Sequence, residues 1–458
     1  MRLDDIVSLL RENFIFAFSI TIILGVVLFV CYRFIYLKWL GGKKSWTTKQ
    51  IVVFLLFVIY MMTVCALTLL NRGSNYQDSV NLALFSSYRE AWYNLSVRAW
   101  QYIYFNILMF VPFGFFLPLL HKRFSRLEWT LLFATLFTGI IETLQYITGF
   151  GIFELDDLFN NVFGAIIGFG VVKAWIVRKR WWWRVSYLSP LLLVIILSGA
   201  LFTYYDMKEF GNLSIVPATK VNMKNVIVTS NIAFNDEKPV ATVYQAPRLS
   251  KDEAEQFAYD FFKNLELDTT NIEIIAYQNE ANYRYHGEPS YFIWLHYLDR
   301  TFDFTDFSSF DIELEEADEA TLKEKLKQFG ITIHEQAQFE RLTLGRYKWK
   351  VDKVQNGNQL VDGTLTADYY EDGTIKSFNQ QIVIYEKVKD VELKSVQQAY
   401  DEFLDGKFKI YNRNIQHIEI EQVEMDYELD SKGFYQPVYV FSSVIDGESA
   451  KLLIPAVK

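Results

Sequence analysis

Polar side chains with acid–base and ligand-binding chemistry lie inside long apolar runs in the first half of this sequence. Glu142 and Gln145 fall within the fourth apolar run, and Asp156 and Asp157 stand at the start of the fifth. Carboxylates and amides are costly in hydrocarbon, and they usually mark a working site when a membrane segment contains them. These residues are therefore the starting point for predicting a functional site.

The spacing of the polar residues predicts that they share helix faces. In the fourth run, one helical stripe consists of Thr135, Thr138, Glu142 and Gln145. In the fifth run, the corresponding stripe consists of Asp157, Asn160 or Asn161, Gly164 and Gly168. The two glycines form a small-xxx-small pair, which lets neighbouring helices approach closely. The third run adds Asn106 and a break at Pro112, Phe113 and Gly114, where proline frees a backbone carbonyl for polar neighbours.

These residues have two interpretations. As a functional site, they offer Glu142, Asp156 and Asp157 as candidate catalytic groups, although no reaction is assigned and enzyme activity stays open. The candidate ligand-binding residues are Asn106, Gln145, Asn160, Asn161 and Arg98, and Arg98 is placed to pair with a carboxylate. In the alternative interpretation, the amides only bind helices together, each hydrogen bond contributing about 0.6 kcal/mol. The two aspartates are then ordinary interface residues, whereas Glu142, deep in its run, favours a functional role.

Six apolar runs predict six transmembrane helices. They cover about residues 14–37, 51–70, 102–120, 127–147, 158–175 and 185–205, and about 20 apolar residues suffice to cross a bilayer. The first, third and fifth connectors are rich in Lys and Arg, so the positive-inside rule predicts that both termini lie outside. The start of the chain lacks the basic region and cleavage site of a signal peptide, so the first run is expected to remain as an anchor. In this orientation the polar cluster lies in the outer leaflet and opens to the outside.

Charge separates the two halves of the chain. Residues 1–206 contain 18 Lys and Arg against 11 Asp and Glu, and residues 207–458 contain 27 against 43. The acidic second half argues against a nucleic-acid partner, because phosphate binding requires a basic face. The only cysteines, Cys31 and Cys65, lie in apolar runs, so the second half has no disulfide framework. No metal-ligand motif or cofactor-binding loop occurs, so neither a metal nor a cofactor is predicted.

Residues 207–458 are expected to form a soluble extracytoplasmic α+β domain, with helices packed on antiparallel sheets. Helices are predicted after the capping box Ser250–Glu253, over Glu315–Gln328 and over Ser395–Leu404. Strands are predicted at about residues 226–228, 240–244, 272–276, 291–297, 347–354, 363–370, 375–385, 418–427, 438–443 and 450–455. A helix followed by a strand meander occurs about twice, which suggests two modules at about 207–330 and 331–458.

Three motifs in the membrane half resemble those of the VanZ-like membrane proteins. They are Asn106-x-x-x-Phe110-x-Pro112-Phe113-Gly114, Glu142-x-x-Gln145 and Asp156-Asp157-x-x-x-Asn161-x-x-Gly164, preceded by an Asn81-Leu-Ala-Leu-Phe85 element. The resemblance covers about residues 50–176. It leaves 1–49 as a leader with the first helix, 177–206 as a basic, Trp-containing connector with the sixth helix, and an added exterior domain that faintly resembles PepSY- or YycI-type modules.

The resemblance implies a role in the envelope of a bacterium, in its cytoplasmic membrane, because the namesake of the family is associated with resistance to the lipid-tailed glycopeptide teicoplanin. The expected partners are therefore a membrane lipid or a lipid-tailed molecule, with an extracytoplasmic protein as a further partner. A membrane-embedded carboxylate enzyme acting on a lipid head group, and an extracytoplasmic sensor acting with a partner, remain alternatives. The sequence departs from the family pattern at Leu84, where relatives have proline, and at Gly151, where relatives have arginine.

Overall fold

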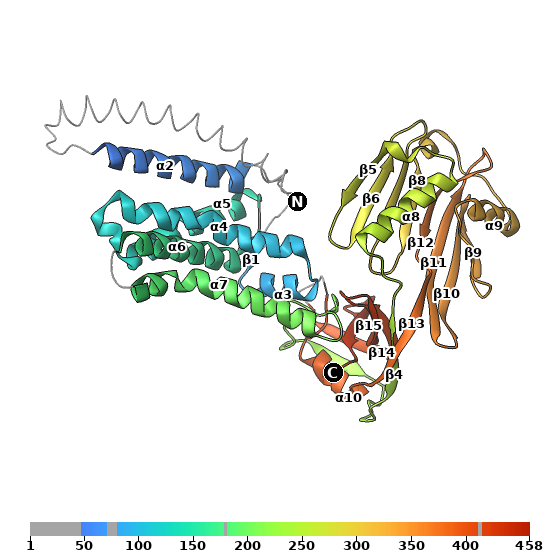
Figure 1. Cartoon of the computed structure of the whole chain (residues 1–458). Helices are drawn as coiled ribbons and strands as arrows, with labels where there is room; N and C mark the ends of the chain where they lie inside the picture. The colour runs from blue at the N-terminus through green and yellow to red at the C-terminus, as the bar shows by residue number, and fades with distance from the viewer. Residues whose placement is uncertain (1–46, 71–79, 178–180, 411–414) are drawn as a thin grey trace. The chain divides into compact units, whose positions relative to one another are not determined.

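A computed structural model describes residues 47–70, 80–177, 181–410 and 415–458 (Figure 1). They form two compact units, with the first ending at Lys208 and the second beginning at Glu209. The first unit is a bundle of helices and the second is built around an antiparallel-rich sheet, which confirms the predicted fold class.

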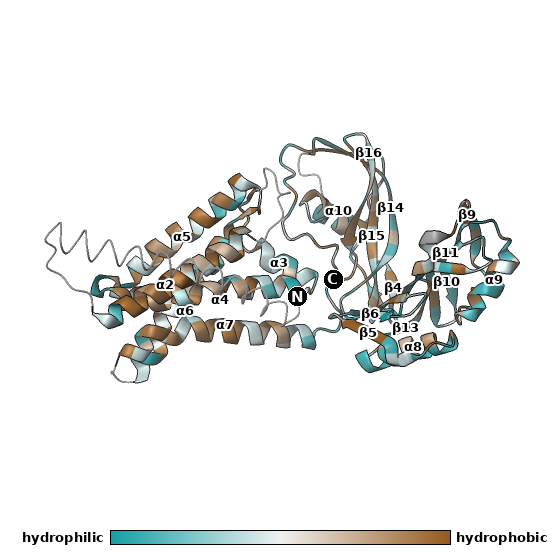
Figure 2. Cartoon of the chain, turned by 90° about the horizontal axis from the view of Figure 1, so that it is seen from above, coloured by the Kyte–Doolittle hydropathy of each residue, from teal (hydrophilic) through white to brown (hydrophobic). Residues whose placement is uncertain are grey.

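The helices of the first unit carry its apolar residues (Figure 2). They are α2 (Thr48–Cys65), the π-helical turn η2 (Ala66–Leu70), α3 (Ser86–Tyr93), α4 (Val97–Leu120), η3 (Lys122–Ser125), α5 (Leu127–Thr148), α6 (Leu155–Ile176) and α7 (Trp181–Met207). Within the described residues, five helices are long and apolar enough to cross a membrane: α2 with its π-turn, α4, α5, α6 and α7. Five of the six predicted spans are thus confirmed, and the predicted first span lies outside the described residues.

Local signals set the ends of these helices. Thr47 and Gln50 form a capping box at the start of α2, and the Ser96 side chain caps α4. Gly149 adopts a left-handed conformation (φ 69°) and ends α5. The helix α7 begins at Trp181 and so includes the tryptophans that were predicted to precede it.

The closest helix approach in this bundle is built on glycines, as the small-xxx-small pair predicted. A Cβ atom on Gly164 would lie 2.0 Å from the Ile107 carbonyl oxygen, and one on Gly168 would lie 1.9 Å from that of Val111. Gly114 faces Ala165 in the same way. Gly164 faces Ile107, and Gly168, four residues later, faces Val111, which is also four residues later. The two helices α4 and α6 therefore run parallel, with their N-terminal halves at the same end of the bundle.

The second unit contains a sheet of 14 strands among the described residues, in the order β3-β14-β15-β4-β13-β11-β12-β8-β7-β6-β5, with β10, β9 and β16 attached at its sides. The strands from the first half of the unit are β3 (Ile227–Ser230), β4 (Val240–Gln245), β5 (Ile272–Ala276), β6 (Glu280–Tyr285), β7 (Tyr291–His296) and β8 (Phe302–Asp306). Those from the second half are β9 (Gln338–Thr343), β10 (Arg346–Asn356), β11 (Gln359–Tyr369), β12 (Ile375–Gln380), β13 (Val383–Glu392), β14 (His417–Leu429), β15 (Phe434–Ile445) and β16 (Glu448–Pro455). The three helices are α8 (Lys251–Asn264), α9 (Glu319–Gln328) and α10 (Val396–Leu404), and short 3-10 turns η4 (Thr269–Asn271) and η5 (Phe307–Asp311) connect strands.

Two sequence predictions for this unit need correction. The helix predicted over Glu315–Gln328 begins only at Glu319, because the Asp318 side chain caps it by accepting a hydrogen bond from the Thr321 amide. The strand predicted over Ile375–Tyr385 is two strands, since β12 and β13 pair with different halves of β11. The chain crosses between them at Gln381, whose carbonyl oxygen approaches Gly363 too closely to admit a Cβ atom.

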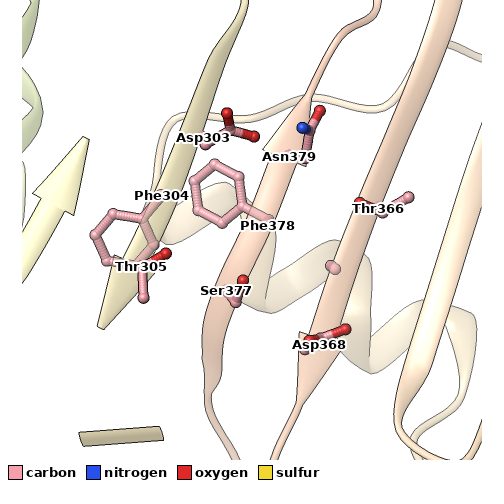
Figure 3. Close-up of a pocket in the computed structure, with 9 residues that line it drawn as sticks. Asp303, Phe304, Thr305, Thr366, Asp368, Ser377, Phe378 and Asn379 are labelled. Atoms are coloured by element: carbon pink, nitrogen blue, oxygen red, sulfur yellow. The ribbon is translucent and has the colours of Figure 1, made fainter. Parts of the chain in front are cut away.

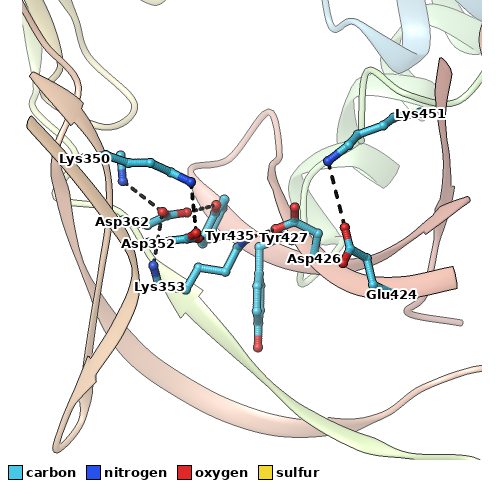
Figure 4. Close-up of polar contacts among 10 residues, drawn as sticks. Lys350, Asp352, Lys353, Asp362, Glu424, Asp426, Tyr427, Tyr435 and Lys451 are labelled. Atoms are coloured by element: carbon cyan, nitrogen blue, oxygen red, sulfur yellow. Dashed lines mark hydrogen bonds and ion pairs between the residues drawn. The ribbon is translucent and has the colours of Figure 1, made fainter. Parts of the chain in front are cut away.

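The second unit contains two main apolar cores. One lies under α8 and α9 and draws its buried residues from 254–378, on both sides of the module boundary predicted at about residue 330. The other lies under α10 and is formed by residues 241 and 393–456. Between them, the Tyr435 hydroxyl donates to Asp362 at 2.6 Å and Lys353 pairs with Asp426 at 2.7 Å (Figure 4). These contacts join the β10–β11 hairpin to β14 and β15.

Candidate functional site

The predicted polar residues meet at one end of the helix bundle. This end holds the N-terminal halves of α4 and α6, the C-terminal half of α5, the π-helical turn η2, and the short helix α3. A two-residue parallel ladder between β1 (Val80–Asn81) and β2 (Phe153–Glu154) fixes the segment before α3 to the segment before α6. Glu142, Gln145, Asp156, Asn160 and Asn161 are all buried there, each at most 2 % exposed.

Asp157 and Asn106 form the central contact between α6 and α4. The Asn106 amide nitrogen donates to the Asp157 carboxylate at 2.6 Å. Asp157 also lies in the first turn of α6, where the positive end of the helix dipole favours a negative charge. The structure therefore brings together two residues that the sequence placed on separate spans, and it leaves Asp157 only partly buried.

Asp156 has a different role, although it is the next residue in the chain. Its carboxylate accepts hydrogen bonds from the amides of Phe85 and Ser87, the latter at 2.8 Å, and from the Ser86 hydroxyl at 3.3 Å. These groups belong to the start of α3, so Asp156 caps that helix. Phe85 has a left-handed backbone (φ 61°), which is unfavourable for a residue with a side chain and which the bond to Asp156 helps to hold.

The amides of α5 and α6 mostly connect helices. Asn161 donates to the Thr138 hydroxyl at 2.8 Å, and Gln145 donates to the Thr68 carbonyl oxygen at 2.9 Å, inside the π-helical turn. The Tyr88 hydroxyl of α3 donates to the Asn160 side-chain oxygen. Two atoms of these amides are buried without a partner within the described residues, the Asn160 amide nitrogen and the Asn161 amide oxygen. Such atoms in a native interior require an explanation, for example a bound water or ligand.

Glu142 and Glu154 complete the cluster. The backbone amide of Glu154 donates to the Glu142 carboxylate at 3.4 Å, and the Ser87 hydroxyl contacts the Glu154 carboxylate at the same distance. Burial, followed by the charges of Asp157 and Asp156, raises the pKa of Glu154 to about 7. Glu154 was not among the predicted site residues. Its signal was available in the sequence, because it precedes two other carboxylates within four residues.

Arg98 does not neutralise these carboxylates. Its guanidinium donates to the Tyr102 hydroxyl at 2.9 Å and lies over the Tyr102 ring on the exposed surface. Gly151, where the family resemblance implies an arginine, is buried. Among the residues that the structure describes, Glu154 and Asp156 form no ion pair, and no group of three His, Cys, Asp or Glu side chains has a metal-binding arrangement. The cluster is thus rich in carboxylates and hydrogen-bonding amides.

The fold and the polar cluster define a multi-pass helical membrane protein with a buried carboxylate–amide site at one end of its bundle. Residues 57–178 match the model of the VanZ/LLP1 family. This stretch includes the predicted motifs, and it confirms a VanZ-like domain close to the predicted range of 50–176. No curated protein matches the chain.

Solved structures give only remote likenesses. The Bacillus megaterium YpeB C-terminal domain matches 46% of this chain and 94% of its own length, with 12% identity and a TM-score of 0.21. An uncharacterized protein from Eubacterium rectale ATCC 33656 matches 50% of this chain and 87% of its own length, also with 12% identity, at a TM-score of 0.20. Similarities of this size carry no conclusion about the fold or function of the second unit.

Proposed function

We propose that the VanZ-like domain serves in the bacterial cell envelope, where its polar cluster binds the head group of an amphiphile, such as a lipid-tailed glycopeptide or a wall precursor. The proposal rests on the two unpartnered amide atoms of Asn160 and Asn161, which lie one helical turn after Asp157 in α6. A polar head group supplies hydrogen-bonding atoms to such a site, while its apolar tail remains in the bilayer.

The predicted orientation supports access from the outside. The basic connector η3, with Lys122 and Arg123, follows α4 at the end opposite to the cluster. The positive-inside rule assigns that end to the cytoplasm. An amphiphile in the outer leaflet then meets Asp157 and Asn106 directly, and binding there contributes to resistance against lipid-tailed antibiotics.

The test compares bacteria that produce Glu142→Gln, Asp157→Asn or Glu128→Gln variants at equal membrane abundance. Glu128 is an exposed carboxylate in the first turn of α5, at the far end of the same helix, so it is a matched control. We expect the first two variants to lose protection against a lipoglycopeptide and the control to retain it. Unchanged susceptibility in both cluster variants would contradict the proposal.

An enzyme acting on a lipid head group is the second candidate, and the raised pKa of Glu154 favours it. A carboxyl group with a pKa of about 7 exchanges its proton at neutral pH, as a general acid or base must. The test is release of head groups from phospholipids or wall-precursor lipids by the purified chain in nanodiscs. Activity that disappears in Glu154→Gln, with an intact fold, would establish it, whereas activity that persists in this variant would exclude Glu154 as the acid or base.

A further inference from the structure

A strip of polar and aromatic side chains crosses the outer face of the sheet in the second unit. Strand register places one row of residues side by side, from β6 through β7, β8 and β12 to β11: Asn282, Trp294, Asp303, Asn379 and Thr366. A second row, two residues further along, consists of Phe292, Thr305, Ser377 and Asp368, and it is flanked by Arg284 on β6 and Arg346 on β10. Directly paired residues in antiparallel strands point to the same face. We call these nine residues the outer strip.

The opposite face of the same strands is the apolar core. Phe304, Phe378 and Ala367 alternate with outer-strip residues and are buried under α8 and α9. The outer strip is half-exposed along its length, so its polar groups face solvent or a ligand. Its centre is hollowed into a cleft of about 260 Å³, whose labelled side chains include Asp303 beside Asn379, with Ser377 and Asp368 in the next row (Figure 3).

The strip offers more hydrogen-bonding groups than it satisfies. The Trp294 ring nitrogen and the Asn282 side-chain oxygen are buried and have no partner within the described residues. Within the cleft, two carboxylates, one amide and three hydroxyls stand on adjacent strands, at spacings of about 4.8 Å between strands. Such a regular grid of short donors and acceptors matches a ligand that carries many hydroxyl groups.

The charges of the cleft favour some hydroxyl-rich ligands over others. The cleft itself holds Asp303 and Asp368 and no basic side chain. Three basic residues flank the two rows: Arg346 pairs with Asp368 at 3.5 Å, Arg284 lies over the Phe307 ring, and Lys348 stands beside Thr366 on β10. The unit around it is strongly acidic, so anionic polymers are repelled. No metal-binding group of side chains occurs among the described residues, which argues against a cation as the main ligand. Trp294 and Phe292 lie at one end of the rows, where a flat ring can pack against the apolar face of a sugar.

We propose that the outer strip binds an uncharged oligosaccharide, with sugar hydroxyls on Asp303, Asn379 and Thr366 and a sugar ring packed against Trp294. This site is independent of the polar cluster in the VanZ-like domain. It gives the exterior unit a role in holding a neutral glycan.

The test measures binding of tetra-N-acetylchitotetraose and of cellotetraose to the full chain in nanodiscs, because sugar-based detergents would compete for the site. Calorimetric titration compares the unaltered protein with Asn379→Ala, Asp303→Asn and Gln422→Ala. Gln422 is an exposed amide on β14, away from the strip, and serves as the control. We expect saturable binding of at least one oligosaccharide, weakened about tenfold by each strip variant and unchanged in the control.

Three results would overturn the proposal. The first is the absence of binding by either oligosaccharide up to about 10 mM, a concentration at which even a weak sugar site is occupied. The second is equal binding by the strip variants and the unaltered protein. The third is self-association of the chain that the strip variants abolish without any oligosaccharide, since the strip would then be an interface between copies. Thermal unfolding of each variant excludes loss of fold as the cause of lost binding.

Discussion

The polar cluster of the helix bundle and the outer strip of the sheet both gather carboxylates, amides and hydroxyls, but they satisfy them differently. In the bundle, the side chains are buried and hydrogen-bond one another across helices, as Asn161 does with Thr138. On the sheet, the side chains are half-exposed and the strands supply their own backbone hydrogen bonds. Polar groups in the bundle are therefore part of what holds the fold, whereas those on the sheet can be changed without disturbing it.

The two regions therefore differ in how many of their polar side chains are available to bind a ligand. In the cluster, Asp156 and Gln145 already hydrogen-bond to backbone groups of other elements. The remaining candidates for binding a ligand are the Asn106–Asp157 pair, the two glutamates and the unpartnered amide atoms. In the strip, Asp368 already pairs with Arg346, and the other polar side chains lie half-exposed on the sheet. The bundle site is accordingly small and rigid, and the sheet site is broad and open.

The largest expected effect comes from Gly168→Val. The new Cβ atom would meet the Val111 carbonyl oxygen at 1.9 Å, so α4 and α6 must separate and the pair of Asn106 and Asp157 must break. We expect a loss of more than about 3 kcal/mol of stability, seen as aggregation of the solubilised protein on size-exclusion chromatography. Gly139→Val is the control, because no described atom lies within 4 Å of a Cβ at that position. Similar behaviour of the two variants would show that the bundle does not depend on this contact.

The next effect separates the adjacent aspartates. Asp156→Ala removes the cap of α3 and leaves the amides of Phe85 and Ser87 without an acceptor, so we expect a loss of about 2 kcal/mol. Asp157→Ala should cost less, because Asp157 is only partly buried whereas Asp156 is 1 % exposed. Thermal unfolding in nanodiscs measures both. A larger loss for Asp157 than for Asp156 would reverse the assignment of structural and binding roles.

A smaller effect is the pH dependence that Glu154 gives to the bundle. Because its pKa is raised from 4.5 to about 7 in the folded state, the folded protein holds this proton more tightly than the unfolded chain. Stability therefore falls as the pH rises from about 4.5 to 7, by about 1–2 kcal/mol, because Glu154 is only partly buried and solvent screens its charge. Glu154→Gln should remove this part of the pH dependence and raise the melting temperature at pH 8. A variant with the same pH profile as the unaltered protein would show that Glu154 titrates normally.

The sequence could predict the bundle because membrane helices are specified locally. Apolar length gave the spans, and intervals of three and four placed Glu142 with Gln145 and Asp157 with Gly164 on common faces. The glycine pair predicted a close helix contact at Gly164 and Gly168, and the structure shows that α4 is the partner helix. The role of Asp156 could not be predicted, because it depends on backbone amides 69 and 71 residues earlier in the chain.

In the second unit, individual helices and strands could be predicted from the sequence, but the pairing of the strands could not. The capping box at Ser250 and the predicted helix over Ser395–Leu404 marked helices correctly, and alternation located most strands. The strands β6, β8 and β9 were missed, and β12 and β13 were merged, because their pairing with distant partners decides where each strand ends. The outer strip arises from the register of five strands, so no interval in the sequence reveals it.

The smallest expected effect lies in this strip, and it is the sharpest test of the contrast between the two regions. Asn379→Ala removes a half-exposed amide whose strand neighbours keep their backbone bonds, so the free energy of unfolding should change by less than about 0.5 kcal/mol. Asn161→Ala, in the bundle, removes a buried bond to Thr138 and should cost about 1 kcal/mol or more. The two asparagines thus form a matched pair for thermal unfolding of the same full-length chain. An equal cost would mean that the strip is covered and structural, and it would contradict the proposal that its polar groups bind a ligand.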